Sequence, residues 1–234
     1  MVSQVRQLIE KVYQEEILKQ KAELKSLRMQ INPHFLYNTL ESINWMARIH
    51  GVPEIGKMVK ALGDLMRASI GGEDFITVRE ETRNVQNYLI IQKFRYGDRI
   101  EAEIRISDEI SDIKIPKLIL QPIVENAIVH GIENKIGNGK IVIEGFAEND
   151  TIVLRVTDDG IGMDEEAVSK ILSENHESCR TESHTHIGLK NVDKRIKMYY
   201  GEKYGISIQS RKGFGTCVSI SFPVHQANTS FDVN

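Results

Sequence analysis

The spacing of apolar residues changes near residue 97, and this change limits the folds open to the chain. Before it, apolar side chains recur every three to four residues, as they do in helices. From Ile100 to Ile106, apolar and charged residues alternate with a period of two, which is typical of a half-buried strand. The sequence therefore predicts an all-helical first part, a boundary near Gly97 and an α+β protein.

The helical part begins with a polar segment and continues into an expected hairpin. Residues 1–28 are rich in Lys, Glu and Gln and carry a thin apolar stripe, which favours a coiled-coil-like connecting helix. Two further helices, ending near Ile49 and covering 54–69, are joined by Gly51-Val52-Pro53, and so short a turn packs them antiparallel. A third helix over 77–96 opens with a capping-box pattern.

Strand and helix patterns alternate in the second part. A polar stretch over 173–186 is expected to form a mobile loop or lid, and 225–234 a disordered tail. The remaining expected elements are a strand over 100–106, a helix over 116–132, strands over 140–147 and 151–157 joined by a turn at 149–150, helices over 165–172 and 188–200, and strands over 206–210 and 216–222.

Composition and charge exclude several classes of protein. The chain has 234 residues, of which 41% are hydrophobic and 27% charged, as in a soluble globular protein. Its net charge of −3 gives no general attraction to nucleic acid or anionic lipid, so neither is an expected partner. Cys179 and Cys217 form no CxxC pair and are expected to be reduced thiols in a cytosolic setting. No run of about 18 apolar residues predicts a membrane span.

One stretch of the first part, Gln30 to Leu40, combines a proline, a histidine and an asparagine in a helical run. His34 directly follows Pro33, and Asn38 lies one turn further along the same helix face. An imidazole nitrogen is a competent nucleophile, but a single histidine in a helix is more often packed or solvated. The choice of His34 as the reactive residue therefore depends on the rest of the chain.

Two stretches of the second part carry polar groups in a pattern that suits a nucleotide. Asn126 and His130 are four residues apart and share a helix face, where an amide oxygen suits Mg²⁺. Asp158 ends a strand and can accept a hydrogen bond from an exocyclic amine, while Gly160 and Gly162 let the backbone approach a flat ring. A plain strand-to-helix turn has the same sequence, so the motif alone leaves both interpretations open.

Two glycine-containing stretches complete the set. Gly188 and Leu189 open a helix, and the free N–H groups and positive dipole of a helix start suit phosphate. Gly213-x-Gly215-Thr216 precedes the last expected strand. Together with the two stretches above, they form a series of four motifs in a fixed order.

This order resembles the ATP-binding domain of the sensor histidine kinases and of the wider ATPase group that includes DNA gyrase B, Hsp90 and MutL. The upstream Gln-Ile-Asn-Pro-His-Phe-Leu-Tyr-Asn-Thr-Leu narrows the resemblance to the LytS/YesM-like subfamily, over about residues 1–223. It implies that 29–96 are dimerisation and phosphotransfer helices that pair into a four-helix bundle. It also implies an ATP-binding catalytic domain over 97–224, a two-layer α/β sandwich with a mixed sheet.

The resemblance assigns a role to each motif. It implies that His34 accepts the γ-phosphate of ATP, and that Asn38 matches the position that orients water for dephosphorylation of the partner in related kinases. Asn126 is implied to bind Mg²⁺, and Asp158 to read the adenine amine. The other residues that it places at the nucleotide are His130, Gly160, Gly162, Gly188, Leu189, Asn191 and Thr216.

Some positions depart from the wider pattern. The acceptor histidine of many sensor kinases is followed by an acid, whereas Phe35 stands here. Glu125 is the nearest candidate for a base on the ATP side, since Pro122 occupies the position of the base in the wider ATPase group. His184 and His186 replace two glycines of the phosphate-facing stretch, so either they hinder ATP binding or lid closure, or the lid tolerates them.

The resulting hypothesis is a dimeric histidine autokinase core that uses Mg-ATP and passes the phosphoryl group to an aspartate of a response regulator. One alternative is a nucleotide-binding signalling scaffold or phosphatase-biased module with weak kinase activity. Another is an ATPase of this group that forms no phosphohistidine. The resemblance also implies a cytoplasmic core that is joined to a cell-membrane sensor only through a region upstream of this sequence.

Overall fold

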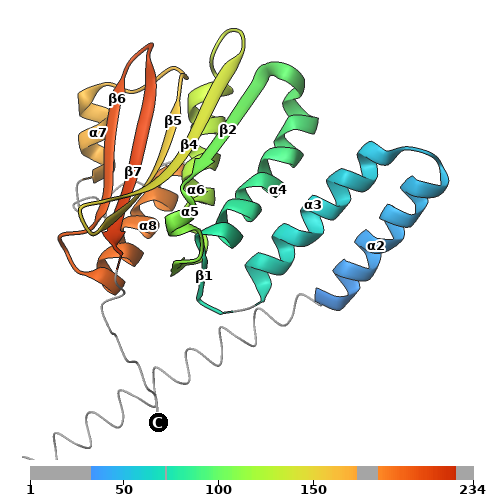
Figure 1. Ribbon diagram of the computed structural model, residues 1–234. Helices are drawn as coiled ribbons and strands as arrows, with labels where there is room; N and C mark the ends of the chain where they lie inside the picture. Colours follow the sequence, from blue (N-terminus) through green and yellow to red (C-terminus); the bar gives the residue numbers. More distant parts are fainter. Residues whose placement is uncertain (1–32, 72, 173–183, 225–234) are drawn as a thin grey trace, which may run out of the picture. The chain divides into compact units, whose positions relative to one another are not determined.

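The computed structural model describes residues 33–71, 73–172 and 184–224, which form two compact units divided between Gly71 and Gly72 (Figure 1). The predictions for 1–28, for most of the polar loop over 173–186 and for the tail over 225–234 lie outside the described residues. Among the helices that are described, none is long and apolar enough to cross a membrane.

The first unit is the predicted helical hairpin. Helix α2 (Pro33–Ile49) and helix α3 (Pro53–Ile70) are joined by a turn in which Gly51 has a φ of 67°, a conformation that costs glycine little. A proline at the start of each helix removes an N–H that would have no partner within the helix. The helices approach closely where Gly56 lies beside Asn44.

The hairpin buries only small and medium-sized apolar side chains and exposes large ones. Its buried apolar residues are Ala47, Val59, Ala61 and Leu65. The large apolar side chains that remain exposed within this unit are Phe35, Ile43, Trp45, Met46, Ile49, Val52, Ile55 and Leu62. The hairpin therefore has an apolar surface that its own two helices do not cover.

The second unit is an α+β domain with a five-stranded sheet and a separate two-stranded ribbon (Figure 1). The strands are β1 (Phe75–Thr77), β2 (Ile100–Ile106), β3 (Lys114–Pro116), β4 (Gly139–Glu148), β5 (Thr151–Asp158), β6 (Gly205–Arg211) and β7 (Gly215–Pro223). The helical elements are α4 (Val78–Tyr96), η1 (Gly97–Arg99), α5 (Asp108–Ser111), α6 (Gln121–Asn126), η2 (Ala127–Ile132), α7 (Glu165–Leu172) and α8 (His184–Tyr200).

The large sheet is mixed and is covered by helices on one face. Its strand order is β2-β4-β5-β7-β6, with β2 parallel to β4 and the other pairs antiparallel. Buried and less buried residues alternate along β4 and β5, and the helices lie on the buried face (Figure 1). Ile143, Leu154 and Phe222 of the sheet are almost fully buried in the core. This two-layer arrangement confirms the predicted fold class.

Several predicted turns and helix ends can be compared directly with the structure. Strand β4 turns into β5 through Asn149 and Asp150, whose φ values of 46° and 61° form the tight turn expected there. Helix α7 has the predicted bounds, Glu165–Leu172. Thr77 and Glu80 form the predicted capping box at the start of α4. Helix α8 begins at His184, one turn earlier than predicted.

The single helix predicted over 116–132 is wrong. Pro116 ends strand β3, which pairs with β1, and Leu118 has a φ of 57°, which no α-helix accommodates. Helix α6 begins at Gln121, and from Ala127 the turns widen into a π-helix. The apolar sequence predicted burial correctly, but the backbone follows three different conformations.

Helix α4 belongs to the second compact unit in the structure. Val78 and Val85 are fully buried in the core of that unit, because the helix packs against α6. The compact units thus divide earlier than the boundary expected near Gly97. The functional domain limits drawn from the sequence stay a prediction.

Candidate functional site

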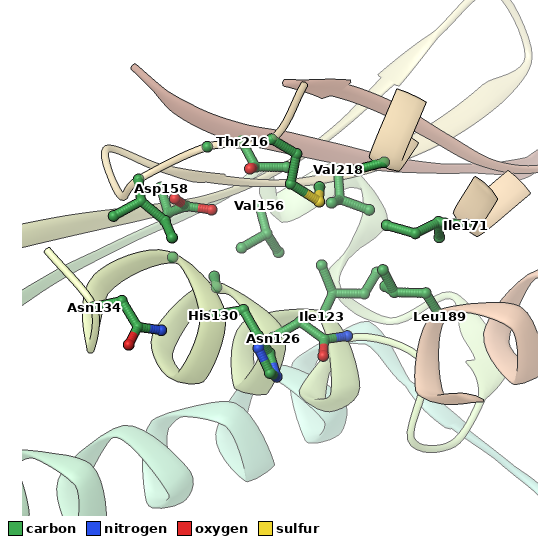
Figure 2. A pocket seen from close by; sticks show the side chains of 16 residues that line it. Ile123, Asn126, His130, Asn134, Val156, Asp158, Ile171, Leu189, Thr216 and Val218 are labelled. Atoms are coloured by element: carbon green, nitrogen blue, oxygen red, sulfur yellow. The ribbon is translucent and has the colours of Figure 1, made fainter. Parts of the chain in front are cut away.

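A cavity of about 310 Å³ lies between the sheet and the helices of the second unit. In Figure 2, Val156, Asp158, Thr216 and Val218 come from the sheet, and Ile123, Asn126 and His130 come from the helical layer opposite. The residues that line the cavity are Ile123, Asn126, Ala127, His130, Gly131, Asn134, Val156, Asp158, Ile161, Gly162, Met163, Ala167, Ile171, Leu189, Thr216 and Val218. Its walls are mostly apolar, with few polar groups, as in many ligand sites.

Asp158 places a carboxylate at the end of β5, within this apolar wall. Its side chain is buried, and its Oδ1 accepts a hydrogen bond from the Gly160 N–H at 2.8 Å. Burial raises the pKa of Asp158 to about 6, although the hydrogen bonds that it accepts from backbone N–H groups oppose that rise. Such a carboxylate gains from a ligand that brings a hydrogen-bond donor.

Glycines let the backbone come close to Asp158. A Cβ atom at Gly131 would lie 2.5 Å from Oδ1 of Asp158, and one at Gly160 would meet the backbone of Gly131. Gly162 lines the cavity with a φ of 62°, and a Cβ atom there would meet the carbonyl of Arg211. A side chain at Gly131 would thus collide with the carboxylate, and side chains at Gly160 and Gly162 would collide with neighbouring backbone.

Asn126 and His130 both line the cavity, on α6 and at the widened turn of η2. The Nδ2 atom of Asn126 is buried and has no hydrogen-bond partner within the described chain, and a buried polar group without a partner is costly. The structure therefore brings together the two residues that the sequence placed on one helix face, and it leaves one of them with unused hydrogen-bonding capacity.

Thr216 lies in β7 opposite the end of β5. Its Oγ1 lies 2.9 Å from Oγ of Ser210, and Ser210 Oγ in turn accepts the Met163 N–H at 2.8 Å. This chain of hydrogen bonds joins three segments that surround the cavity, since Thr216 and Met163 both line it. Thr216 is thus another predicted residue that the structure brings to the same cavity.

Helix α8 contributes Leu189 to the cavity wall, whereas Gly188 and Asn191 are not part of that wall. A Cβ atom at Gly188 would lie 3.9 Å from Asn126 Nδ2, so this glycine adjoins the cavity without being part of its wall. Asn191 is exposed and does not line the cavity. Its expected contact with phosphate stays a prediction.

Glu125 is also exposed and outside the cavity wall. Burial is the main reason that the pKa of Tyr88 on α4 is raised, and the charge of Glu125 adds to that rise. The role of Glu125 as a base stays a prediction.

His34 and Asn38 lie together on α2 in the first unit. Both side chains are exposed, and Asn38 Nδ2 is 3.4 Å from both ring nitrogens of His34. The expected spacing of one helical turn is thus present, with the imidazole accessible to a reactant.

Most of the apolar residues that line the cavity were not predicted from the sequence. Ile123, Ile161 and Met163 were not singled out, although apolar residues at a strand end and at a helix start are a weak signal for a cavity floor. Gly131 was also missed, and only its position after His130 could have drawn attention to it.

The cavity suits adenine, and Asn126 suits one ligand position of Mg²⁺. Asp158 can accept a hydrogen bond from an exocyclic amine between apolar walls. Within the described ranges no group of three or more His, Cys, Asp or Glu side chains could hold a metal ion. The amide oxygen of Asn126 could supply one ligand to Mg²⁺, beside phosphate and water oxygens.

Two family models match successive parts of the chain. Residues 22–100 match the model described as histidine kinase. Residues 111–226 match the model described as histidine kinase-, DNA gyrase B- and HSP90-like ATPase. The first match contains His34, and the second contains every residue of the cavity wall.

Curated relatives cover nearly the whole chain. Sensor histidine kinase YesM of Bacillus subtilis strain 168 is 39% identical over 224 residues, which are 95% of this chain and 37% of the relative. Sensor protein LytS of Staphylococcus haemolyticus strain JCSC1435 is 30% identical over 87% of this chain and 34% of its own length. This chain thus spans little more than a third of the relatives that it matches.

Solved histidine kinase structures are more distant. The catalytic domain of histidine kinase ThkA is 23% identical, with a TM-score of 0.49, and the match covers 64% of this chain and 98% of that one. The family matches and the curated relatives do not depend on this distant likeness. On those grounds, the chain belongs to the LytS/YesM-like sensor histidine kinases.

Proposed function

We propose that this chain is an autokinase core that binds Mg-ATP in the cavity of the second unit and transfers the γ-phosphoryl group to His34. The observation that carries the proposal is the convergence of Asn126, of Asp158 and Gly162, and of Thr216, from three separate segments, on one apolar cavity. The family matches support the same function, because they cover both the histidine and the cavity.

In this proposal, the adenine ring lies between the apolar walls of the cavity. The exocyclic amine donates a hydrogen bond to Asp158, whose buried carboxylate accepts backbone N–H groups in the described part of the chain. The glycines around it allow the ring to approach the backbone. These contacts fix the base and leave the phosphates to extend along α6.

The phosphates then lie near Asn126 and His130, with Gly188 of α8 close by. The amide oxygen of Asn126 supplies one ligand to Mg²⁺, which neutralises charge on the phosphates. The Asn126 Nδ2 atom, which lacks a partner in the described chain, is available to donate to a phosphate oxygen. The cation and the donors together favour the charge distribution of phosphoryl transfer.

Transfer is a direct displacement at phosphorus. The lone pair of a neutral imidazole nitrogen of His34 forms the N–P bond, the bond between the γ-phosphorus and the bridging oxygen breaks, and ADP leaves. The exposed imidazole and the adjacent Asn38 fit a residue that must meet other groups. An aspartate of a response regulator then takes the phosphoryl group, and Asn38 orients water when that partner is dephosphorylated.

The apolar surface of the hairpin is proposed to bind a second copy of the chain. Large exposed side chains such as Phe35, Trp45 and Met46 would be covered when two hairpins form a four-helix bundle. In the same proposal, the core lies in the cytoplasm and is connected to a membrane sensor through other parts of a longer protein.

Labelling with Mg-ATP that carries a radioactive γ-phosphate tests the proposal. The wild-type chain should acquire acid-labile, base-stable label, and His34→Gln should acquire none. His50→Gln is the matched control, because His50 is an exposed histidine just beyond α2 and should leave labelling unchanged. Nucleotide binding without label would favour a signalling scaffold, and steady phosphate release independent of His34 would favour an ATPase.

A further inference from the structure

Helix α4 carries a buried carboxylate that the proposed chemistry does not use. Glu81 lies in the first turn of α4, and its side chain is only 1% exposed. Its two oxygens accept the N–H groups of Leu118 and Leu120 at 3.0 and 2.9 Å. A fully buried charge is costly unless it is satisfied in this way, so the position of this carboxylate has a specific structural reason.

Glu81 supplies the cap that helix α6 lacks. The N-cap residue of α6 is Leu120, which has no side-chain acceptor, and Pro122 follows in the first turn. The first N–H groups of a helix have no partner within it and are normally capped by a nearby Ser, Thr, Asp or Asn. Here a glutamate from another helix accepts the N–H of the N-cap residue itself. Burial raises the pKa of this carboxyl group, and the backbone N–H donors oppose that rise.

A second side chain, from another helix, also contacts the loop before α6. We call residues 117–120, which precede α6, the clamp loop. Arg195 of α8 donates from Nη1 to the carbonyl of Lys117 at 2.6 Å. Leu118 has a φ of 57°, a conformation that is strained for leucine and persists only when its surroundings enforce it.

The clamp loop sets where α6 begins. The carbonyl of Leu120 accepts the N–H groups of both Ile123 and Val124 at 3.1 Å, so a shift of the loop displaces the first turn of the helix. One turn later, α6 presents Asn126 to the cavity. Helix α8, which carries Arg195, also presents Leu189 to the cavity from the other side.

We propose that Glu81 and Arg195 are positioning residues that act through the clamp loop to orient α6, and with it Asn126 and His130, toward the phosphates of a bound nucleotide. This inference rests on the proposed nucleotide site. Since α4 directly follows β1, which comes after the hairpin in the chain, Glu81 also connects the segment leading out of the hairpin with the nucleotide-binding helix.

Four variants separate positioning from a general loss of stability. Glu81→Gln keeps the size of the side chain but replaces one acceptor with a donor, and Arg195→Gln removes the second anchor of the loop. Their matched controls are Glu80→Gln, which retains a capping residue, and Lys194→Gln, which changes an exposed neighbour. Each variant is titrated with Mg-ADP by calorimetry, at a temperature where thermal unfolding shows it to be folded.

We expect Mg-ADP to bind about tenfold more weakly to Glu81→Gln and about threefold more weakly to Arg195→Gln, with both controls unchanged. Amide hydrogen exchange should accelerate over 117–132 in both variants but not in strands β4 and β5, because only the loop and its helix lose their anchors. A uniform loss of stability would instead accelerate exchange in the sheet as well.

Unchanged Mg-ADP affinity in folded Glu81→Gln, or exchange that accelerates equally throughout the second unit, would overturn the inference. If Glu81→Gln does not fold, Arg195→Gln decides by the same two measurements, since its side chain is exposed. Failure of the wild-type chain to bind Mg-ADP would count against the proposed function alone. In that case the exchange pattern still decides whether the clamp loop positions α6, because it needs no nucleotide.

Discussion

The two compact units differ in what their apolar side chains do. The second unit buries a continuous core with Ile143, Leu154 and Phe222 almost inaccessible, whereas the hairpin leaves Trp45 and Met46 more than half exposed. A unit with its own core can hold a precisely shaped cavity. A unit with an uncovered apolar surface is suited to an exchangeable partner. The difference fits the proposed roles, nucleotide binding for the second unit and association for the hairpin.

The largest expected effect is on the stability of the second unit. Ile143→Ala should lower its free energy of unfolding by about 3 to 4 kcal/mol, because the lost side chain leaves a cavity in the core. Ile136→Ala removes a fully exposed side chain of the same size and should cost less than about 0.5 kcal/mol. Urea unfolding followed by circular dichroism measures both, and equal costs would contradict the assignment of the core.

The next largest expected effect is a loss of nucleotide affinity when a residue of the cavity is changed. Asp158→Ala removes the acceptor proposed for the adenine amine, and ADP affinity should fall about a hundredfold, or ~3 kcal/mol. The exposed neighbour Asp164 provides the control, since Asp164→Ala should change affinity less than twofold. Calorimetry that finds equal affinities for wild type and Asp158→Ala would remove Asp158 from the site.

A charge placed on the apolar surface of the hairpin should weaken dimerisation and leave the second unit unaffected. Trp45→Glu places a charge on the apolar surface and should weaken the proposed dimerisation about thirtyfold, because an aromatic side chain often dominates an interface. Sedimentation velocity over a range of concentrations measures this. Ser42→Glu adds a charge at another exposed position of α2 and indicates how much of the effect comes from charge alone.

The smallest expected effect concerns pH. Because the pKa of Asp158 is raised to about 6, its carboxylate is protonated as the pH falls below that value and loses an acceptor for the adenine amine. Adenosine, which has no phosphate to titrate, should therefore bind about tenfold more weakly at pH 5 than at pH 7.5.

The stability of the unbound chain should change in the opposite sense over the same range. With the pKa raised, the folded state binds a proton at Asp158 between about pH 4 and pH 6 while the unfolded state does not, so this residue adds stability as the pH falls. Asp158→Asn should remove this contribution.

The binding prediction has its own contradicting outcome. A wild-type chain whose adenosine affinity does not depend on pH would show that the carboxylate does not contact the base.

Structural features could be predicted correctly from the sequence where a local pattern of residues determines them. The turn at Asn149 and Asp150 and the capping box at Thr77 depend on residues close together in the chain, and both are present. The polar residues Asn126 and Asp158 were also found from their local motifs, and they do line one cavity.

Features that depend on distant residues were not predictable. The unusual conformation of Leu118 is held by Glu81, which is far away in the sequence, so no local pattern reveals where α6 begins. Helix α4 appeared to continue the helical first part, because its amphipathic pattern does not say which unit it packs against. Its position became clear only from the burial of Val78 and Val85.

The parallel pairing of β2 with β4 has a consequence for how the proposed nucleotide site forms during folding. Parallel neighbours cannot be joined by a tight turn, and the chain between Ile106 and Gly139 contains α6 and η2. The helix that presents Asn126 is thus the crossover that closes this pair. Its final placement requires contacts between distant parts of the chain, which form slowly during folding. A newly made chain should therefore acquire its hairpin before it can hold a nucleotide.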